Sequence, residues 1–261
     1  MAFTVHAVMP GVWHIVDCMG VCMTLLEGEN AAMLVDTGYG IEDVADFMRH
    51  MTDLPLTVFL THNHHDHAMG ARCFPETYML EADMADWNIF TNDEMRRRVL
   101  TQAIGKNLTV DEKTFLAGEI PLPKVMKPGV IDLGGLTAEI IEAPGHTPGS
   151  AVVYVPERKL LLSGDDWNPC TWLFFPQALG LREYRSNMRG IQQLPFEKVL
   201  CPHREALYDR WMFDDFFNAL TDGNLRAAEP VNIAPYEQID TCQATLPHDQ
   251  VFVFDWAKSG L

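Results

Sequence analysis

The chain has no run of about 18 consecutive apolar residues, the length that a membrane-spanning helix needs. Its first residues contain neither the basic stretch nor the apolar segment of a secretory signal. There is no low-complexity segment and no CxxC pair among the six cysteines, so we expect reduced thiols. These absences predict a globular protein that is cytoplasmic and has no membrane contact.

Basic residues are scarce. The sequence has 19 Lys and Arg against 36 Asp and Glu, which gives a formal net charge of −17. Binding to nucleic acid requires clustered Lys and Arg, because these replace the counterions of the phosphates. The one dense basic cluster, Arg96-Arg97-Arg98, is flanked by Asp93 and Glu94 and is interpreted as a solvated helix face. We therefore expect a small-molecule substrate and no nucleic-acid partner.

The pattern of apolar residues predicts a strand-rich chain with one helical interruption. Runs at 3–8, 11–16, 21–27 and 31–35 resemble a meander, and residues 41–51 have helical apolar spacing. A further helix is expected at 207–220, and residues 251–256 are expected to form a final edge strand. We predict a single domain over residues 1–261 with a helical insertion at about 81–128.

What the chain does contain is a dense group of metal-ligand side chains. The apolar run 56–60 leads directly into Thr-His-Asn-His-His-Asp-His at 61–67. Imidazole nitrogens and a carboxylate suit zinc, iron or another first-row divalent cation. The spacing can direct His62 and His64 to one ion, and Asp66 and His67 to another. A histidine-rich loop can also be a solvated turn or a tag, but this one is internal and follows a strand.

Three further segments place a potential ligand just beyond a strand-like run. His146 lies in a turn of Pro and Gly between two such runs, Asp165 follows the run 160–162, and His203 follows the run 198–200. Sites of α/β proteins commonly lie beyond the carboxyl ends of strands. Four such segments in one chain indicate a shared metal site.

With these motifs the chain resembles the metallo-β-lactamase superfamily over about residues 20 to 205. The resemblance implies an α/β fold, an αββα four-layer sandwich, with two divalent metal ions at one edge of the two packed sheets. The ligands that it implies are His62, His64 and His146 on the first ion, Asp66, His67 and His203 on the second, and Asp165 as the bridge. Asp36, in the motif Asp36-Thr37-Gly38, would support the metal-binding loop without being a ligand.

The chemistry of such a site favours hydrolysis. A metal-bound water reaches a pKa of about 7, so a hydroxide that bridges two ions is available at neutral pH as a nucleophile. Asp165 would hold both ions, and Asp66 could also guide a proton, so we assign both carboxylates to catalysis. The histidines must be neutral to bind, and the site should lose metal as the pH falls. Zinc is the expected metal, although iron and manganese accept the same ligands.

The segment after Asp165 is the predicted wall of the substrate pocket. The candidates for substrate contact are Trp167, Asn168, Trp172, Phe174 and Tyr184. The amide of Asn168 could donate to a developing oxyanion. Apolar residues of the insertion are a second candidate wall, but we favour their simply packing the insertion onto the sandwich: Met79, Met84, Trp87, Ile89, Phe90 and Met95.

Several branches of the superfamily remain to be compared. True β-lactamases usually have Cys or Ser at the position of Asp165, and flavin-partnered diiron proteins have a glutamate where His64 stands. Hydroxyacylglutathione hydrolases share the full ligand set, but their basic C-terminal region is matched only in part by Arg204 and Arg210.

The function we predict is a metal-dependent hydrolase of a small ester, thioester or lactone. The alternatives are a phosphodiesterase of the same superfamily and a non-hydrolytic metalloprotein, either a redox diiron protein or a ligand sensor. The natural substrate, the metal and the oligomeric state stay open at this level.

Overall fold

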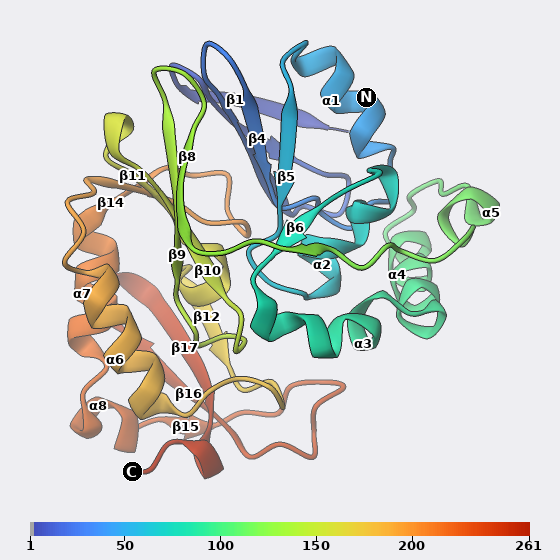
Figure 1. Ribbon diagram of the computed structural model, residues 1–261. Helices are drawn as coiled ribbons and strands as arrows, with labels where there is room; N and C mark the ends of the chain where they lie inside the picture. The colour runs from blue at the N-terminus through green and yellow to red at the C-terminus, as the bar shows by residue number, and fades with distance from the viewer. Residues whose placement is uncertain (1–2) are drawn as a thin grey trace.

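Two β-sheets packed face to face form the centre of the fold, with helices on their outer sides (Figure 1). The computed structural model describes residues 3–261. The first sheet has seven strands, and their spatial order follows the chain: β1 (Thr4–Met9), β2 (Val12–Val16), β3 (Cys22–Glu27), β4 (Ala32–Val35), β5 (Leu56–Phe59), β6 (Tyr78–Met79) and β7 (Lys124–Val125). The second has six strands: β14 (Tyr208–Asp209), β13 (Lys198–Leu200), β11 (Leu160–Leu162), β10 (Ala151–Val155), β9 (Thr137–Glu142) and β8 (Gly129–Asp132).

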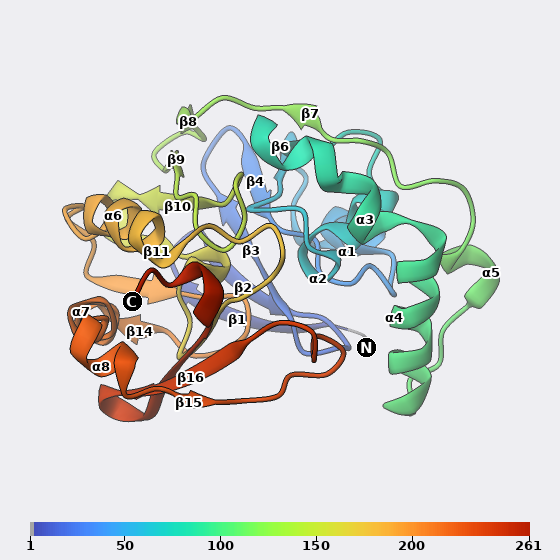
Figure 2. The ribbon, with the colours of Figure 1, turned by 90° about the horizontal axis from the view of Figure 1, so that it is seen from below.

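Helices flank both sides of the packed sheets. The helices and 3-10 turns are α1 (Val44–Met51), α2 (His65–Ala68), η1 (Met69–Cys73), η2 (Glu81–Asp86), α3 (Trp87–Thr91), α4 (Asp93–Gly105), α5 (Glu112–Phe115), η3 (Pro156–Arg158), η4 (Gly164–Asp166), α6 (Leu181–Ile191), α7 (Arg210–Ala219), α8 (Asp222–Arg226), η5 (Pro247–Asp249) and η6 (Trp256–Lys258). Helices α6 to α8 lie on one side of the molecule, and α1 with α3 to α5 lie on the other (Figure 2). This is the predicted αββα arrangement, and the helical residues from 81 to 115 fall within the segment expected to be an insertion.

Three apolar cores fill the spaces between the layers. Side chains such as Met33 and Phe59 of the first sheet pack against Val153 and Leu160 of the second. The outer face of the first sheet packs on α1, whose first turn is capped by the carboxylate of Asp43. The outer face of the second sheet packs on α6 and α7. Burial of one face per sheet accounts for the layers.

A third sheet, which the sequence reasoning did not anticipate, lies beside the second. Its four strands run in the order β12 (Cys170–Leu173), β17 (Gln250–Asp255), β16 (Thr241–Leu246) and β15 (Glu229–Pro230). The prediction that the last strand is an edge strand is wrong, because β17 pairs with β12 on one side and β16 on the other. Its burial on both faces is the physical sign of a central strand.

The basic cluster Arg96-Arg97-Arg98 on α4 differs in part from the predicted solvated helix face. Arg96 is only 3% exposed, and its guanidinium donates to the carbonyls of Phe115 and Gly118 at the end of α5. Arg97 and Arg98 remain well exposed, and Arg98 pairs with Glu94 one turn earlier. One of the three arginines is therefore structural, since it satisfies carbonyls that the short helix leaves unpaired.

The strand directions determine where the site lies. Strand β5 runs parallel to β4, and β11 runs parallel to β13. The loops that leave the carboxyl ends of β5, β11 and β13 carry residues 61–67, Asp165 and His203, respectively. Segments far apart in the chain thus meet at one edge of the two sheets. Among the described residues, no helix combines the length and the apolar character that crossing a membrane requires.

Candidate metal centre

The loop after β5 turns the predicted ligands inward. His64 precedes the first residue of α2, and its carbonyl accepts from the backbone N–H groups of His67 and Ala68. The carbonyl of His67 accepts in turn from both the N–H and the hydroxyl of Thr37, each at 2.8 Å. The short helix is therefore pinned to the loop that follows β4, which fixes the direction of its side chains.

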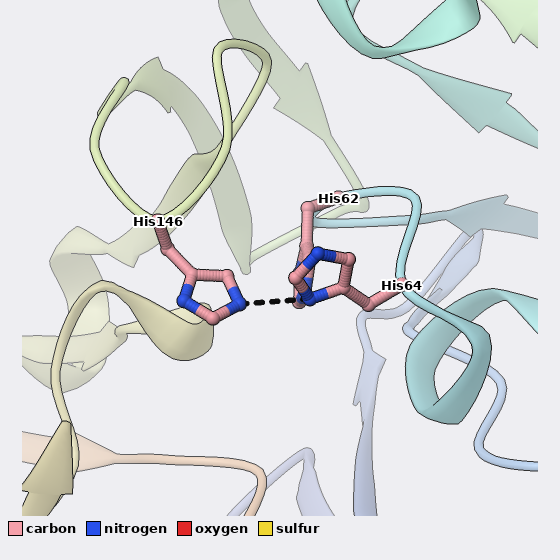
Figure 3. A group of neighbouring side chains, drawn as sticks. All are labelled: His62, His64 and His146. Atoms are coloured by element: carbon pink, nitrogen blue, oxygen red, sulfur yellow. Dashed lines mark hydrogen bonds between the residues drawn. The ribbon is translucent and has the colours of Figure 1, made fainter. Parts of the chain in front are cut away.

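His62, His64 and His146 form the first group of potential ligands (Figure 3). All three are buried, and Nε2 of His146 lies 2.9 Å from Nδ1 of His64. The three ring centroids are 4.6 to 4.9 Å apart. Two segments that are 82 residues apart in the chain therefore meet as predicted, with ring nitrogens close enough to share one cation.

Asp66, His67 and His203 form the second group. Oδ2 of Asp66 lies 3.7 Å from Nε2 of both His67 and His203. Asp165 lies between the groups: its oxygens are 3.0 Å from Nε2 of His203, 3.5 Å from Nε2 of His67 and 3.5 Å from Nε2 of His146. A carboxylate in this place can reach a cation in either group.

Several buried polar atoms of these residues have no hydrogen-bond partner, and they indicate whether the residues suit metal ions. Nε2 of His62, Nε2 of His67 and Oδ1 of Asp165 are buried without a hydrogen bond of acceptable geometry. Such groups are costly unless something satisfies them. A cation would satisfy all three, and nitrogen with carboxylate oxygen is a donor set that divalent first-row metals accept. The residues therefore fit a metal centre.

In three of these histidines, the second ring nitrogen has a polar partner of its own. Nδ1 of His146 donates to the carbonyl of Trp172 at 2.7 Å, and Nδ1 of His62 lies 3.1 Å from the hydroxyl of Thr61. Nδ1 of His67 donates to Oδ2 of Asp36 at 3.0 Å. Such partners fix the ring orientation and the tautomer of metal-binding histidines. The expectation that Asp36 supports the loop agrees with this geometry.

The electrostatics of the two groups differ. Burial lowers the pKa of His62, His64 and His146, so these rings are neutral. Burial also acts to lower the pKa of His67, but the carboxylates of Asp165, Asp66 and Asp36 outweigh it and raise that pKa. The pKa of Asp66 is lowered to about 2, because His67, His65 and His203 outweigh its burial. The second group therefore attracts positive charge strongly.

Asp83 is a supporting residue that sequence reasoning missed. Its carboxylate accepts from the N–H of Gly149 at 2.6 Å, the hydroxyl of Thr147 at 2.7 Å and the N–H of Asn63 at 3.2 Å. It thereby joins the insertion to both loops that carry the first group. Burial raises the pKa of this carboxyl, while its three donors act to lower it. A single aspartate in η2 gives no sequence signal for this role.

We expect Asp83→Ala to lower the free energy of unfolding by about 2–4 kcal/mol, because buried donors lose their acceptor. The affinity for metal should fall roughly 10- to 100-fold, as for other groups that orient ligands. Urea unfolding and competition with a chelator measure the two effects. Glu81→Ala, at an exposed position of the same 3-10 helix, is the control and should change neither value. A metal affinity equal to that of the unmodified chain would contradict the role of Asp83.

A cavity of about 510 Å³ opens above the two groups. Of the predicted contacts, Asn168 and Trp172 line it, whereas Trp167, Phe174 and Tyr184 do not. These three side chains are fully buried in the core beneath, and the hydroxyl of Tyr184 donates to the carbonyl of Asp166. The rest of the lining includes Phe175, Arg204 and the loop residues Ala234, Pro235 and Tyr236.

The helical segment that we expect to be an insertion supplies another wall of this cavity. Phe90, Met95, Arg98, Val99 and Gln102 line it from α3 and α4. The other candidates do not: Met79 and Trp87 are buried in a core that the helical segment shares with residues 60–71, Met84 packs against that core, and Ile89 is exposed. The expectation that these residues only pack the insertion thus holds for some of them and is wrong for Phe90 and Met95.

One class of α/β metalloproteins has this architecture: two packed sheets are flanked by helices, and groups of His and Asp lie beyond the ends of the strands. The family model described as the metallo-beta-lactamase superfamily matches residues 16–203, so the chain belongs to this superfamily. Most of its members are metal-dependent hydrolases.

Two curated proteins are similar to this chain. The acyl-coenzyme A thioesterase MBLAC2 of Gallus gallus is 26% identical over 202 residues, which are 69% of this chain and 70% of that protein. The hydroxyacylglutathione hydrolase of Bartonella tribocorum is 25% identical over 150 residues, which are 56% of this chain and 48% of that protein. The match therefore spans about half the length of the second relative.

Solved structures share the fold at low identity. The metallo-beta-lactamase from Pontibacter korlensis is 17% identical, with a TM-score of 0.60 over 84% of this chain and 99% of that one. The protein TTHA1623, solved in a di-iron-bound form, is 21% identical, with a TM-score of 0.52 over 74% of this chain and 92% of that one.

Proposed function

We propose that the chain is a metal-dependent hydrolase that cleaves a thioester between an apolar acyl group and an anionic thiol. The observation that carries this proposal is the convergence of two His/Asp groups on the floor of a cavity of about 510 Å³. The cavity joins aromatic walls to two arginines. Ester and lactone substrates belong to the same reaction type and stay as alternatives.

The ligand assignment that we propose follows the two groups. His62, His64 and His146 would hold one ion, and Asp66, His67 and His203 would hold the other. Asp165 would be shared between the two groups, because its two oxygens face nitrogens of either group. When bound, the pair of divalent ions supplies Lewis acidity and activates water for attack at neutral pH. Zinc is our first expectation, and the di-iron form of one structural relative keeps iron open.

The remaining residues act by orientation and by hydrogen bonding. Oδ1 of Asn168 accepts from the N–H of Cys170 at 2.8 Å, so Nδ2 is the atom available to donate into the cavity. We propose that it donates to the substrate carbonyl oxygen as negative charge develops there. Asp66, whose pKa is held near 2, stays ionised and can orient the attacking water by accepting its proton in a hydrogen bond.

The cavity walls support an amphipathic substrate. Phe90, Trp172, Phe175 and Tyr236 offer apolar surface to an acyl chain, which gains about 0.8 kcal/mol for each buried methylene. Arg98 and Arg204 lie in the lining as well and offer positive charge to a leaving group. Coenzyme A and glutathione, which appear in the names of the two curated relatives, are both anionic thiols.

The direct experiment measures hydrolysis by metal-loaded protein with aryl esters, acyl thioesters, lactones and phosphodiesters. We expect the highest kcat/KM for an acyl-coenzyme A. If the thioesters are inert while another class of substrate is turned over, the proposal fails. Loss of activity after treatment with a chelator, and its return with added metal, would tie the reaction to the two groups.

The arginines give a sharper test of the leaving group. We expect Arg98→Met or Arg204→Met to lower kcat/KM for an acyl-coenzyme A about tenfold, the worth of one partly exposed hydrogen bond to a charged group. The same acyl group on N-acetylcysteamine, an uncharged thiol, should be hydrolysed at an unchanged rate. Arg97→Met is the control, because Arg97 is on α4 but outside the cavity. Equal losses on both substrates would argue against anion recognition.

A further inference from the structure

Gln177 contacts a predicted metal ligand from outside the two groups. Its side-chain amide lies 2.5 Å from Nε2 of His64, the ring nitrogen that faces away from His146. The contact joins residues 113 apart in the chain. Gln177 is in the turn that follows β12, and the mechanism above gives it no part.

The turn that carries Gln177 is fixed independently of His64. The ammonium of Lys258 donates to the carbonyls of Phe175, Pro176 and Ala178 at 3.1, 2.7 and 3.0 Å. The N–H of Leu179 donates to the carbonyl of Gly145, the residue before His146. The backbone of the turn is thus held in place by the 3-10 helix η6 and by the neighbouring loop, so the side chain of Gln177 starts from a fixed point beside His64.

Without a cation, the hydrogen bonds around His64 would determine where its ring protons lie. A carbonyl can only accept, so Nδ1 of His146 carries a proton toward Trp172, and its Nε2 is an acceptor. Nδ1 of His64, 2.9 Å away, then donates to it. In a neutral ring the remaining nitrogen, Nε2 of His64, is an acceptor, and it receives the amide Nε2–H of Gln177.

A cation held by His64 through Nδ1 requires the opposite tautomer. The lone pair must then be on Nδ1, the proton moves to Nε2, and Nε2 needs an acceptor in place of a donor. Rotating the amide of Gln177 by 180° about its last bond presents its carbonyl oxygen to the same nitrogen without moving the rest of the chain. We propose that Gln177 is a positioning residue that selects the metal-binding tautomer of His64 by this rotation.

This inference rests on the proposed metal site but not on the reaction. An acceptor at Nε2 makes the ring of His64 a better ligand and prevents it from turning away, as other partners of ligand histidines do. Glutamate at position 177 would keep an acceptor and could not donate, so it should favour the metal-binding tautomer in the absence of metal. Leucine would keep most of the volume and remove the acceptor.

The experiment compares Gln177→Leu, Gln177→Glu and the unmodified chain. Nuclear magnetic resonance of 15N-labelled histidine reports the tautomer of His64 with and without zinc, and competition with a chelator gives the dissociation constant of the ion. We expect Gln177→Leu to bind metal roughly 10- to 100-fold more weakly. Gln177→Glu should bind at least as tightly as the unmodified chain. The control is Gln102→Leu, which removes an amide from the wall of the cavity without a contact to a proposed ligand.

The outcomes separate the two proposals. If the unmodified chain binds no metal, the proposed site fails. If it binds metal and Gln177→Leu binds equally well, only the role of Gln177 fails. A folded Gln177→Leu chain, checked by circular dichroism, with weakened metal and rescue by glutamate supports the inference. A His64 tautomer that is the same with and without zinc would overturn it.

Discussion

Asp165→Ala should leave the chain with less than one tightly bound ion. It should also lower kcat/KM roughly 10²- to 10⁴-fold, which corresponds to a loss of several kcal/mol of transition-state stabilisation. The carboxylate lies within 3.0 to 3.5 Å of ring nitrogens from both groups, so its loss weakens two sites at once. It would also leave buried histidines without their negative partner. Elemental analysis of dialysed protein and kcat/KM on a thioester measure the two effects.

Two further variants separate the role of Asp165 from a general loss of charge. Asp165→Asn keeps the volume and one neutral oxygen, so it should retain part of the metal but little of the activity. Glu205→Gln removes an exposed carboxylate that pairs with His6, two positions after His203 in the chain, and should leave both values unchanged. Unchanged turnover by Asp165→Ala in a metal-loaded preparation would end the assignment of a shared carboxylate.

The proposed metal ligands could be predicted to lie together because their signal is local. Residues 61–67 hold most of the ligands within one loop, and each remaining ligand directly follows a strand-like run. Once the strands pair in parallel, their carboxyl ends meet at one edge of the sheets. Spacing along the chain therefore carried the information needed to place His62, His146 and Asp165 near one another.

The residues that support these ligands gave no such signal. Asp83 contacts Thr147 across 64 positions, and Gln177 contacts His64 across 113. Each is a single polar residue in a 3-10 helix or a turn, with no periodicity or spacing that marks it. Contacts of this kind depend on how residues 81–115 and the third sheet pack against the rest of the fold, and a local sequence pattern does not determine that packing.

The substrate wall was predicted only in part because a strand has two faces. Trp172 on β12 faces the cavity, whereas its neighbour Leu173 is buried in the core. Trp167 and Phe174 lie outside β12, where strand alternation does not decide their orientation, and both are fully buried. Reading the aromatic run as one wall ignored the alternation of side chains along a strand. The pairing of β12 with β17, which fixes the register, came from a distant segment.

Asp36→Ala should lower the free energy of unfolding of the metal-free chain by about 3–5 kcal/mol. The carboxylate is 3% exposed and accepts from the N–H of Thr61 at 2.7 Å, from its hydroxyl at 2.9 Å and from Nδ1 of His67 at 3.0 Å. These buried donors would be left unpaired, at about 1–3 kcal/mol each when they cannot relax. The residue also adopts a φ of 64°, which alanine tolerates less well than aspartate or asparagine.

Comparison of Asp36→Ala with Asp36→Asn separates the hydrogen bonds from the backbone. Asparagine accepts the left-handed conformation and keeps one acceptor, so it should lose less stability than alanine. In both variants His67 loses its charged partner, and the second ion should bind roughly 10- to 100-fold more weakly. Urea unfolding without metal and chelator competition with metal give the two values. An Asp36→Ala chain within 1 kcal/mol of the unmodified stability would show that this buried carboxylate is not what holds the β5 loop beneath the candidate metal centre, because even one unpaired buried donor costs about that much.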